Sequence, residues 1–264
     1  MITALSIAGS DPTGGAGLQA DLQVFRHLGV HGMGVVSALT VQDTHKVSRV
    51  LPVFPNVVLD QLRTLLGDIR PDAVKIGALG SDDVVRNVEL GLRELDPAHG
   101  VPVVMDPVLA ASDGTPLLER RAWGSLADLI GRAHLVTPNL LEAGSLTGTD
   151  VSQREGVEAA GLALVTGLGA GAALVKGGHA EGPADDLLVL REGGSASLHW
   201  LAGERIEGAD VHGTGCALSS AIAAYLARGA GLRDAVEAGR RFVREALERT
   251  PARLLVYPEA PELD

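Results

Sequence analysis

Residues 212–224 read HGTGCALSSAIAA, a glycine-containing turn that leads into a run of small, helix-forming residues. Gly213 and Gly215 allow the backbone to turn tightly and to come close to a ligand. The helix that follows directs its unpaired N–H groups and its positive dipole end toward the turn, an arrangement that binds anions. The stretch therefore predicts an anion site suited to a phosphoryl group in transfer, with Cys216 in the first turn of the helix.

Cys216 is the only cysteine in the chain, and its place at the start of the predicted helix suggests a chemical role. A thiol near a helix N-terminus has a lowered pKa, so we expect Cys216 to act as a base or as a charged hydrogen-bond acceptor. These residues alone leave an alternative open, in which the turn simply enters a core helix and the cysteine is buried for structural reasons.

The rest of the chain alternates short apolar runs with amphipathic helical stretches. Strands are predicted at residues 3–8, 34–40, 73–76, 101–105, 135–136, 172–176 and 186–190. Helices are predicted at residues 17–28, 57–66, 82–95, 118–130, 140–146, 154–164, 215–228 and 232–249. This alternation predicts an α/β fold with a mostly parallel central sheet, covered by helices on both faces. We expect a single domain over residues 1–264, with residues 250–264 as a loosely held tail.

The composition of the 264 residues excludes several classes of protein. Aromatic residues make up only 3%, which argues against stacking platforms for single-stranded nucleic acid. A formal net charge of −11 argues against nucleic-acid and anionic-membrane partners. A single cysteine excludes an intrachain disulfide and a cysteine zinc cluster. No leader is visible and no apolar run reaches the roughly 20 residues of a membrane helix, so we expect a cytoplasmic location.

Residues 9–17 read GSDPTGGAG and follow the first predicted strand. Their spacing does not fit the Gly-x-Gly-x-x-Gly dinucleotide fingerprint, because Asp11 stands at a glycine position. It does not fit the Walker A motif either, because no Lys-Ser/Thr follows the glycines. We interpret the glycines as a flexible edge near a substrate, with Asp21 one helical turn into the site. The alternative is a polar hinge with Asp21 on a solvated face of the helix.

Polar side chains follow three further predicted strands. Asp106 comes directly after strand 101–105, where a Mg²⁺ or phosphate site is expected. Asn139 and Glu142 have the spacing of a helix capping box, and the same pair can also anchor a hydrated Mg²⁺. Lys176 ends a strand beside two glycines, where it can reach phosphates; the alternative is an exposed amine at a turn. Together these groups predict Mg²⁺-assisted phosphoryl transfer.

Seven segments of the chain together resemble one known family. They occur in order at residues 9–21, 38–42, 75–77, 106–108, 137–139, 175–179 and 212–216. With these segments the chain resembles the hydroxymethylpyrimidine/phosphomethylpyrimidine kinases of thiamine biosynthesis, members of the ribokinase-like superfamily, from Met1 to about Arg249. The cysteine is the most specific part of the resemblance, since most ribokinase-like enzymes carry aspartate at that position.

The resemblance implies a three-layer αβα ribokinase-like fold and an ATP- and Mg²⁺-dependent kinase that forms a homodimer. It implies two successive phosphorylations, first of 4-amino-5-hydroxymethyl-2-methylpyrimidine and then of its monophosphate. Carried over residue by residue, the resemblance implies a pyrimidine site of Gly9, Asp21 and Gln42, and a phosphoryl site of Gly213, Gly215 and Cys216. It also implies ATP contacts from Lys176 and Thr214. Finally, it implies a Mg²⁺ site of Asp106, Asn139 and Glu142.

The chain departs from the family pattern at several positions. Ala78 stands where the family usually has methionine, which implies a wider pyrimidine pocket, and Val211 and Ala217 replace two usual threonines. A Gly-His-Gly-Pro segment usual near the C-terminus is absent. The main alternative is a pyridoxal/pyridoxine kinase of the cysteine-containing group, whose substrate is also a flat heteroaromatic ring with a hydroxymethyl group. A second alternative is a non-catalytic ligand-binding protein on the same fold, which a test of ATP turnover would separate.

Overall fold

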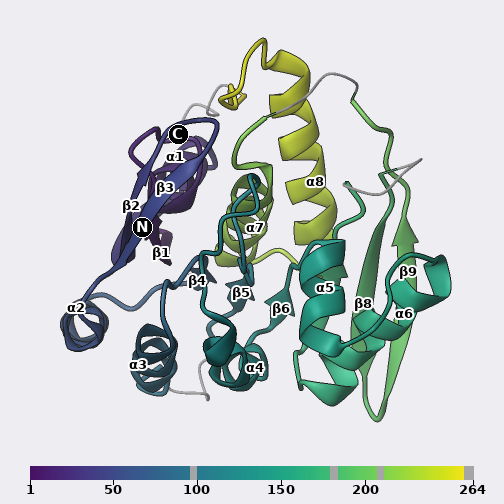
Figure 1. The fold of residues 1–264 in the computed structure, drawn as a ribbon, viewed down its shortest axis with the longest axis horizontal. Helices are drawn as coiled ribbons and strands as arrows, with labels where there is room; N and C mark the ends of the chain where they lie inside the picture. Colours follow the sequence, from purple (N-terminus) through teal and green to yellow (C-terminus); the bar gives the residue numbers. More distant parts are fainter. Residues whose placement is uncertain (96–99, 179–183, 207–210, 259–264) are drawn as a thin grey trace.

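The structure, a computed structural model, describes residues 1–95, 100–178, 184–206 and 211–258. Within these residues the chain forms one nine-stranded sheet in the order β3-β2-β1-β4-β5-β6-β7-β8-β9. Helices cover both faces of the sheet (Figure 1), so the predicted three-layer αβα fold is confirmed. His179, which belongs to one of the seven segments of the resemblance, lies outside the described residues.

The centre of the sheet is parallel and its edges are antiparallel. The parallel strands of the described chain are β1 (Thr3–Ser10), β2 (His31–Gln42), β4 (Ala73–Ile76), β5 (Val103–Met105), β6 (Leu135–Val136) and β7 (Ala172–Val175). The antiparallel strands are β3 (Val47–Pro52), beside β2, and β8 (Asp186–Glu192) and β9 (Ser195–Leu201), beyond β7. The mostly parallel sheet predicted from the sequence is confirmed.

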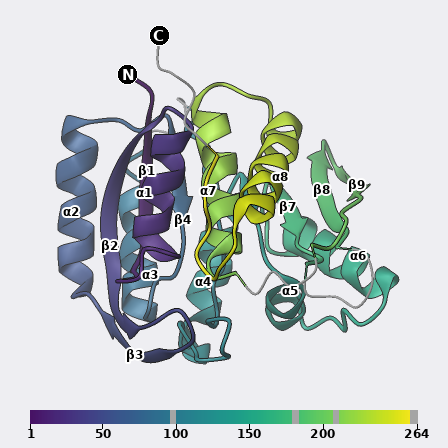
Figure 2. The same cartoon turned by 90° about the horizontal axis from the view of Figure 1, so that it is seen from above.

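The helices form two layers, one on each face of the sheet (Figures 1 and 2). One layer consists of α1 (Gly17–His27), α7 (Thr214–Ala227) and α8 (Leu232–Arg249). The other consists of α2 (Pro55–Asp68), α3 (Asp82–Leu92), α4 (Trp123–Ile130), α5 (Leu140–Thr147) and α6 (Arg154–Leu162). Among the helices of the described chain, none has the length and apolar character that crossing a membrane requires.

Side chains alternate along each strand, so the sheet contributes to two separate hydrophobic cores. Leu5 and Ile7 of β1 pack into the core under α2–α6, while Ala4 packs into the core under α1, α7 and α8. Every residue of β4 is buried, because helices cover it from both sides. Such strands carry the nearly continuous apolar runs by which they were predicted.

The sequence prediction misses strands β3 and β9. Both leave part of their surface exposed and carry polar residues, so they lack the apolar runs that identify the central strands. The prediction also extends three helices too far, and one of them, predicted over 82–95, ends at Leu92 as α3. The stretch 118–130 is a 3₁₀ turn, Arg120–Ala122, followed by α4, and the stretch 154–164 ends as α6 and continues into a π turn, Ala163–Gly167.

The predicted loose tail, residues 250–264, is attached to the body of the protein over its described part. Leu254 pairs with His212 in an isolated parallel bridge. The ring of Tyr257 stacks on Phe242 of α8, with 5.7 Å between the ring centroids. Leu255 and Tyr257 pack against the core layer of α1, α7 and α8, and these contacts explain the attachment because they offset the loss of chain freedom.

Candidate active site

A pocket of about 1390 Å³ lies at the carboxyl ends of the parallel strands. It is lined by Gly9 from β1, Gln42 at the end of β2, Asp106 just after β5, Asn139 after β6 and Lys176 just after β7. This placement follows the rule that ligands of parallel sheets bind beyond the carboxyl ends of the strands. The other predicted residues that line the pocket are Glu142, Gly213, Thr214, Gly215 and Cys216.

The anion loop, defined as residues 212–216, enters α7 through a left-handed glycine. Gly213 has φ 84° and ψ 11°, and a Cβ atom there would lie 1.8 Å from the carbonyl oxygen of Gly15, so only glycine fits. No side chain of the described residues caps the start of α7. The first N–H groups of this helix are therefore available to a ligand in the pocket, which is the geometry of an anion site.

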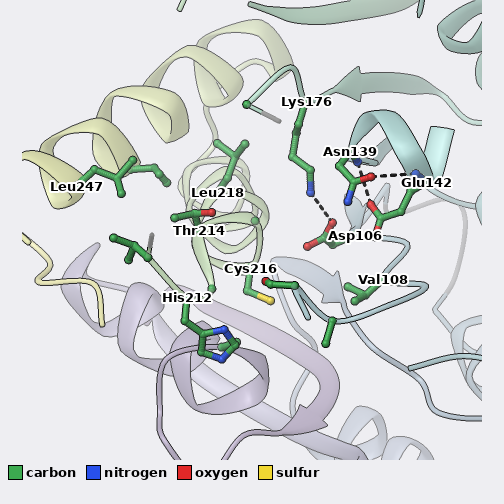
Figure 3. A pocket seen from close by; sticks show the side chains of 18 of the residues that line it. Asp106, Val108, Asn139, Glu142, Lys176, His212, Thr214, Cys216, Leu218 and Leu247 are labelled. Atoms are coloured by element: carbon green, nitrogen blue, oxygen red, sulfur yellow. Dashed lines mark hydrogen bonds and ion pairs between the residues drawn. The ribbon is translucent and has the colours of Figure 1, made fainter. Parts of the chain in front are cut away.

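Cys216 lies in the pocket wall on the first turn of α7 and is half-buried (Figure 3). Burial raises the pKa of its thiol to about 11; Lys75 acts in the opposite direction, while Asp21 and Asp106 raise the pKa further. The raised pKa contradicts the expected lowering, because desolvation and two nearby carboxylates outweigh the effects of Lys75 and the Gly17 N–H. Cys216 is a neutral thiol near pH 7.

Lys176 and Asp106 form an ion pair that faces the pocket (Figure 3). Nζ of Lys176 donates to Oδ1 of Asp106 at 2.8 Å. Burial alone would lower the pKa of Lys176, but the carboxylates of Asp106 and Glu142 outweigh it and the pKa is raised. A Cβ atom at Gly215 would lie 3.1 Å from Nζ of Lys176 and 3.6 Å from Oδ2 of Asp106, so the missing side chain keeps this pair open to the anion loop.

Asn139 and Glu142 form a capping box at the start of α5. Oδ1 of Asn139 accepts from the Glu142 N–H at 2.9 Å, and Oε2 of Glu142 accepts from the Asn139 N–H at 2.8 Å, as the spacing predicted. Oε1 of Glu142 accepts from the Leu109 N–H at 3.4 Å. Burial raises the pKa of Glu142 to about 7; Lys176 opposes this rise and Asp106 adds to it.

The residues predicted for Mg²⁺ lie together on one wall of the pocket (Figure 3). Asp106 and Glu142 place two carboxyl groups beside the ammonium of Lys176. Within the described ranges, no group of three or more His, Cys, Asp or Glu side chains is arranged to hold a metal. Mg²⁺ uses few protein carboxylates and keeps several waters, so the donor set fits a hydrated Mg²⁺ shared with phosphate oxygens.

Asp21 lies beneath the pocket and is not among the residues that line it. Its two oxygens accept from Nζ of Lys75, each at 2.8 Å, and from the hydroxyls of Ser6 and Ser220 at 2.6 and 2.7 Å. These protein donors surround the carboxylate, and the predicted contact between Asp21 and a substrate ring stays a prediction. Burial would lower the pKa of Lys75, but Asp21 reverses this and the pKa is raised.

The pocket has a polar part and an apolar part. One apolar part of its lining comes from β9, the segment after it and α8, and includes Leu201, Ile206, Val243 and Leu247. In Figure 3, Thr214 and Cys216 lie between Leu247 on one side and Val108 on the other. Aliphatic side chains of this kind can cover the face of a flat ligand ring.

Two buried or half-buried pairs near the pocket were not assigned from the sequence. Nε2 of His212 lies 2.9 Å from Oδ2 of Asp11, and Lys75 pairs with Asp21. All four residues belong to the segments that carry the resemblance. However, His212 and Asp11 are 201 positions apart in the sequence, and Lys75 and Asp21 are 54 positions apart. Spacing along the chain carries no signal for such pairs, so a structure was needed to find them.

Comparison with known proteins identifies relatives over nearly the whole chain. Residues 11–255 match the family described as phosphomethylpyrimidine kinase. A hydroxymethylpyrimidine/phosphomethylpyrimidine kinase of Rhizobium meliloti is 42% identical over 246 residues, which cover 92% of this chain and 90% of the relative. The thiamine biosynthesis bifunctional protein ThiED of Geobacter sulfurreducens is 41% identical over 244 residues; these cover 92% of this chain but only 48% of that protein.

Solved structures of two activities resemble this fold. A phosphomethylpyrimidine kinase from Clostridium difficile 630 has a TM-score of 0.81 and 34% sequence identity, covering 94% of this chain and 100% of the other. The ADP complex of Bacillus subtilis pyridoxal kinase has a TM-score of 0.82 and 31% identity, covering 94% of this chain and 92% of the other. Similar folds therefore occur in a phosphomethylpyrimidine kinase and in a pyridoxal kinase.

Proposed function

The chain belongs to the phosphomethylpyrimidine kinase family, and from this premise we propose that it is an ATP- and Mg²⁺-dependent kinase of thiamine biosynthesis. It phosphorylates the hydroxymethyl group of 4-amino-5-hydroxymethyl-2-methylpyrimidine and then the resulting monophosphate. The observation that carries the proposal is the anion loop, whose free helix N–H groups lie between the apolar lining of α8 and the polar part of the pocket. A phosphoryl group passing between two bound rings would meet this loop.

The substrate ring fits the part of the pocket formed by the ends of β1 and β2. Gly9, Ala38 and Gln42 line it, together with Ala78. The amide of Gln42 offers both a donor and an acceptor, which suits the edge of an aminopyrimidine. Because Asp21 is occupied beneath the pocket, Gln42 is the side chain that we assign to reading the ring.

Phosphoryl transfer needs positioning and charge stabilisation more than covalent chemistry. The N–H groups at the start of α7 and the ammonium of Lys176 stabilise the negative charge of the group in transfer. Cys216 contacts the hydroxymethyl side as a neutral thiol, in keeping with its raised pKa. The aliphatic residues of α8 and β9 hold the nucleotide base, and Thr214 adds a hydroxyl beside the phosphates.

Asp106, Asn139 and Glu142 hold Mg²⁺ and its waters in this proposal. When bound, the ion neutralises charge on the phosphates and orients them for in-line transfer. The residues themselves are kept in place by the capping box and by the ion pair between Lys176 and Asp106. Folding does not depend on the ion, because the cap and the pair are formed by protein groups.

A coupled kinase assay with three acceptors tests the proposal. The pyrimidine, its monophosphate and pyridoxal are compared at equal concentrations with ATP and Mg²⁺. We expect the highest kcat/KM for the pyrimidine and measurable turnover of its monophosphate. In Gln42→Leu, kcat/KM should fall strongly for the pyrimidine only. No ATP turnover with any acceptor would contradict the proposal.

Pyridoxal kinase activity is the second candidate, and two observations favour it. The Bacillus subtilis pyridoxal kinase resembles this chain as closely in fold as the pyrimidine kinase from Clostridium difficile does. The small side chain of Ala78 lines the pocket where the family usually has methionine, which leaves room for a bulkier ring. A kcat/KM ratio below one for the pyrimidine over pyridoxal would select this candidate.

A homodimer is part of the proposal. On β2, Ala38, Thr40 and Gln42 line the pocket, so the alternate residues Leu39 and Val41 face away from it, and both are exposed. Leu51, their exposed neighbour on β3, lies opposite Leu39. A second copy of the chain covers this apolar face. Light scattering should give twice the chain mass, and Leu39→Lys should give the mass of one chain; a monomer in the unaltered protein would contradict this.

A further inference from the structure

We propose that Asp11 and His212 form a clasp that positions the N-terminal glycine loop, residues 9–17, against the anion loop. The clasp is a positioning device: neither side chain is required to touch the reacting atoms. Its kinetic consequence rests on the proposed function, because only a transfer reaction makes the spacing between the two loops matter. Its structural consequence can be measured without any substrate.

Asp11 organises the whole glycine loop from inside. It is almost fully buried, and its carboxylate accepts from the Thr13 N–H at 2.8 Å, the Thr13 hydroxyl at 2.9 Å and the Ala16 N–H at 2.9 Å. The Asp11 N–H in turn donates to Oε1 of Gln19 at 2.9 Å. A buried carboxylate with this many donors fixes the path of the loop around it.

His212 joins this carboxylate to the anion loop. Its Nε2 lies 2.9 Å from Oδ2 of Asp11, and since an ionised carboxylate only accepts, Nε2 carries the hydrogen and donates it. Burial would raise the pKa of Asp11, but the hydrogen bonds from His212, Thr13 and Ala16 outweigh it and the pKa is lowered. The His212 N–H also donates to the Arg253 carbonyl oxygen at 2.8 Å, so the histidine is fixed from both sides.

The two loops touch at two further points next to the clasp. Gly213, the residue after His212, packs so closely on the Gly15 carbonyl that no Cβ fits between them. The N–H of Gly17, at the other end of the glycine loop, interacts with the thiol of Cys216. A shift of His212 would therefore move Cys216 and the first N–H groups of α7 relative to the substrate side of the pocket.

The consequence for catalysis follows from the sensitivity of transfer reactions to geometry. The glycine loop carries Gly9 on the ring side, and the anion loop carries the groups that receive the phosphoryl charge. Displacing a reacting group by about 1 Å can lower a rate on the order of a hundredfold, even when each group still binds its own ligand. Loss of the clasp should lower kcat and leave the KM for ATP nearly unchanged.

Three variants test the clasp. His212→Leu removes the donor, whereas His212→Gln places an amide Nε2–H near the position of the imidazole donor. We expect kcat to fall roughly tenfold to a hundredfold in His212→Leu, with most of the loss restored in His212→Gln. His199→Gln, on β9 away from both loops, is the matched control and should leave kcat unchanged.

Amide hydrogen exchange gives a readout that needs no substrate. In His212→Leu, exchange should accelerate on the order of tenfold in peptides covering both residues 9–17 and 212–216, and remain unchanged in β1 and β4. A role confined to general stability would accelerate exchange in the strands as well, which would overturn the clasp. Unchanged exchange in residues 9–17, or a His212→Gln variant as defective as His212→Leu, would overturn it too.

Asp11→Asn provides a second route if His212→Leu does not fold. It keeps the volume of Asp11 but turns one accepting oxygen into a donor, so it should accelerate exchange in both loops like His212→Leu. Normal exchange in either loop of this variant would overturn the proposal. If the unaltered protein phosphorylates none of the three acceptors, the proposed function fails, while the exchange measurements still decide the clasp.

Discussion

Two lysine–aspartate pairs lie close to the same pocket, and they differ in what surrounds them. Lys75 and Asp21 meet at 2.8 Å with both side chains 0% exposed. Lys176 and Asp106 meet at the same distance, but their side chains are 14% and 4% exposed and line the pocket. Serine hydroxyls surround the first pair, Lys75 and Asp21, which we call the enclosed pair. The second pair, Lys176 and Asp106, faces the cavity, and we call it the open pair.

The comparison shows that the type of pair does not decide its role. A buried pair whose carboxylate is filled by protein donors has nothing left to offer a ligand, and it connects α1 to β1, β4 and α7. A pair that opens on a cavity, with Glu142 as a further carboxyl group nearby, leaves room for the phosphate and the metal of the proposed reaction. The two pairs therefore predict different responses to the same substitution, a loss of stability for the first and a loss of activity for the second.

The largest effect is expected from Lys75→Met, which removes the cation from the enclosed pair. It leaves the carboxylate of Asp21 buried without its charge partner, which should lower the free energy of unfolding by about 3–5 kcal/mol. Urea denaturation measures this loss. Adding Asp21→Asn to the same chain should recover part of it, because the uncompensated charge is gone. A loss below about 1 kcal/mol in Lys75→Met would remove the distinction between the two pairs.

Lys176→Met is the matching change in the open pair, and its effect should appear in catalysis. We expect kcat/KM to fall about a hundredfold, because a charge that stabilises the transferred phosphoryl group is lost. The unfolding free energy should fall less than in Lys75→Met, since water in the pocket can solvate Asp106. The exposed Lys46, in the turn between β2 and β3, provides the control as Lys46→Met. Full activity in Lys176→Met would show that the open pair is structural as well.

Glu142→Gln separates the metal role from the capping role beside the open pair. The amide oxygen of glutamine can still accept from the Asn139 N–H, so the start of α5 should remain capped. The Mg²⁺ concentration for half-maximal activity should rise about tenfold, while the melting temperature should hardly change. Asn139→Ala is the contrasting variant, since it breaks the cap and should lower stability by about 1 kcal/mol. A destabilised Glu142→Gln with a normal Mg²⁺ response would assign Glu142 to the cap alone.

The smallest effect is expected in the pH dependence of Cys216 alkylation. Charged groups of both pairs shift the pKa of this thiol. Its pKa is raised to about 11, so the thiolate fraction should keep increasing with pH throughout the neutral and mildly alkaline range. The rate of alkylation by iodoacetamide should therefore climb about tenfold per pH unit between about pH 7 and 9, without a plateau. A small free thiol in the same buffers serves as the control, because its alkylation rate shows the pH dependence of a thiol with an ordinary pKa. A plateau below about pH 8 would instead support the lowered pKa of Cys216, and hence the thiolate, that the sequence predicts.

The sequence predicts the parts of the site that depend on local order along the chain. Asp106 and Lys176 were found because parallel strands end at one edge, and the capping box of Asn139 and Glu142 because its spacing is fixed by the helix. The environment of Asp21 could not be predicted, because its partners come from β1, β4 and α7, up to 199 positions away. The direction of the Cys216 pKa was wrong for the same reason, since burial and distant carboxylates are properties of the assembled fold.

The left-handed glycine of the anion loop has a consequence for mutational libraries of this protein. Gly213 and Gly229 have nearly the same φ angle, 84° and 86°, but a Cβ at Gly229 would meet nothing within 4 Å. Asparagine at position 229 should thus be tolerated at a strain of roughly 1 kcal/mol, whereas every substitution at position 213 collides with the Gly15 carbonyl. A saturation library selected for growth or activity should therefore retain diversity at position 229 and return a single amino acid at position 213.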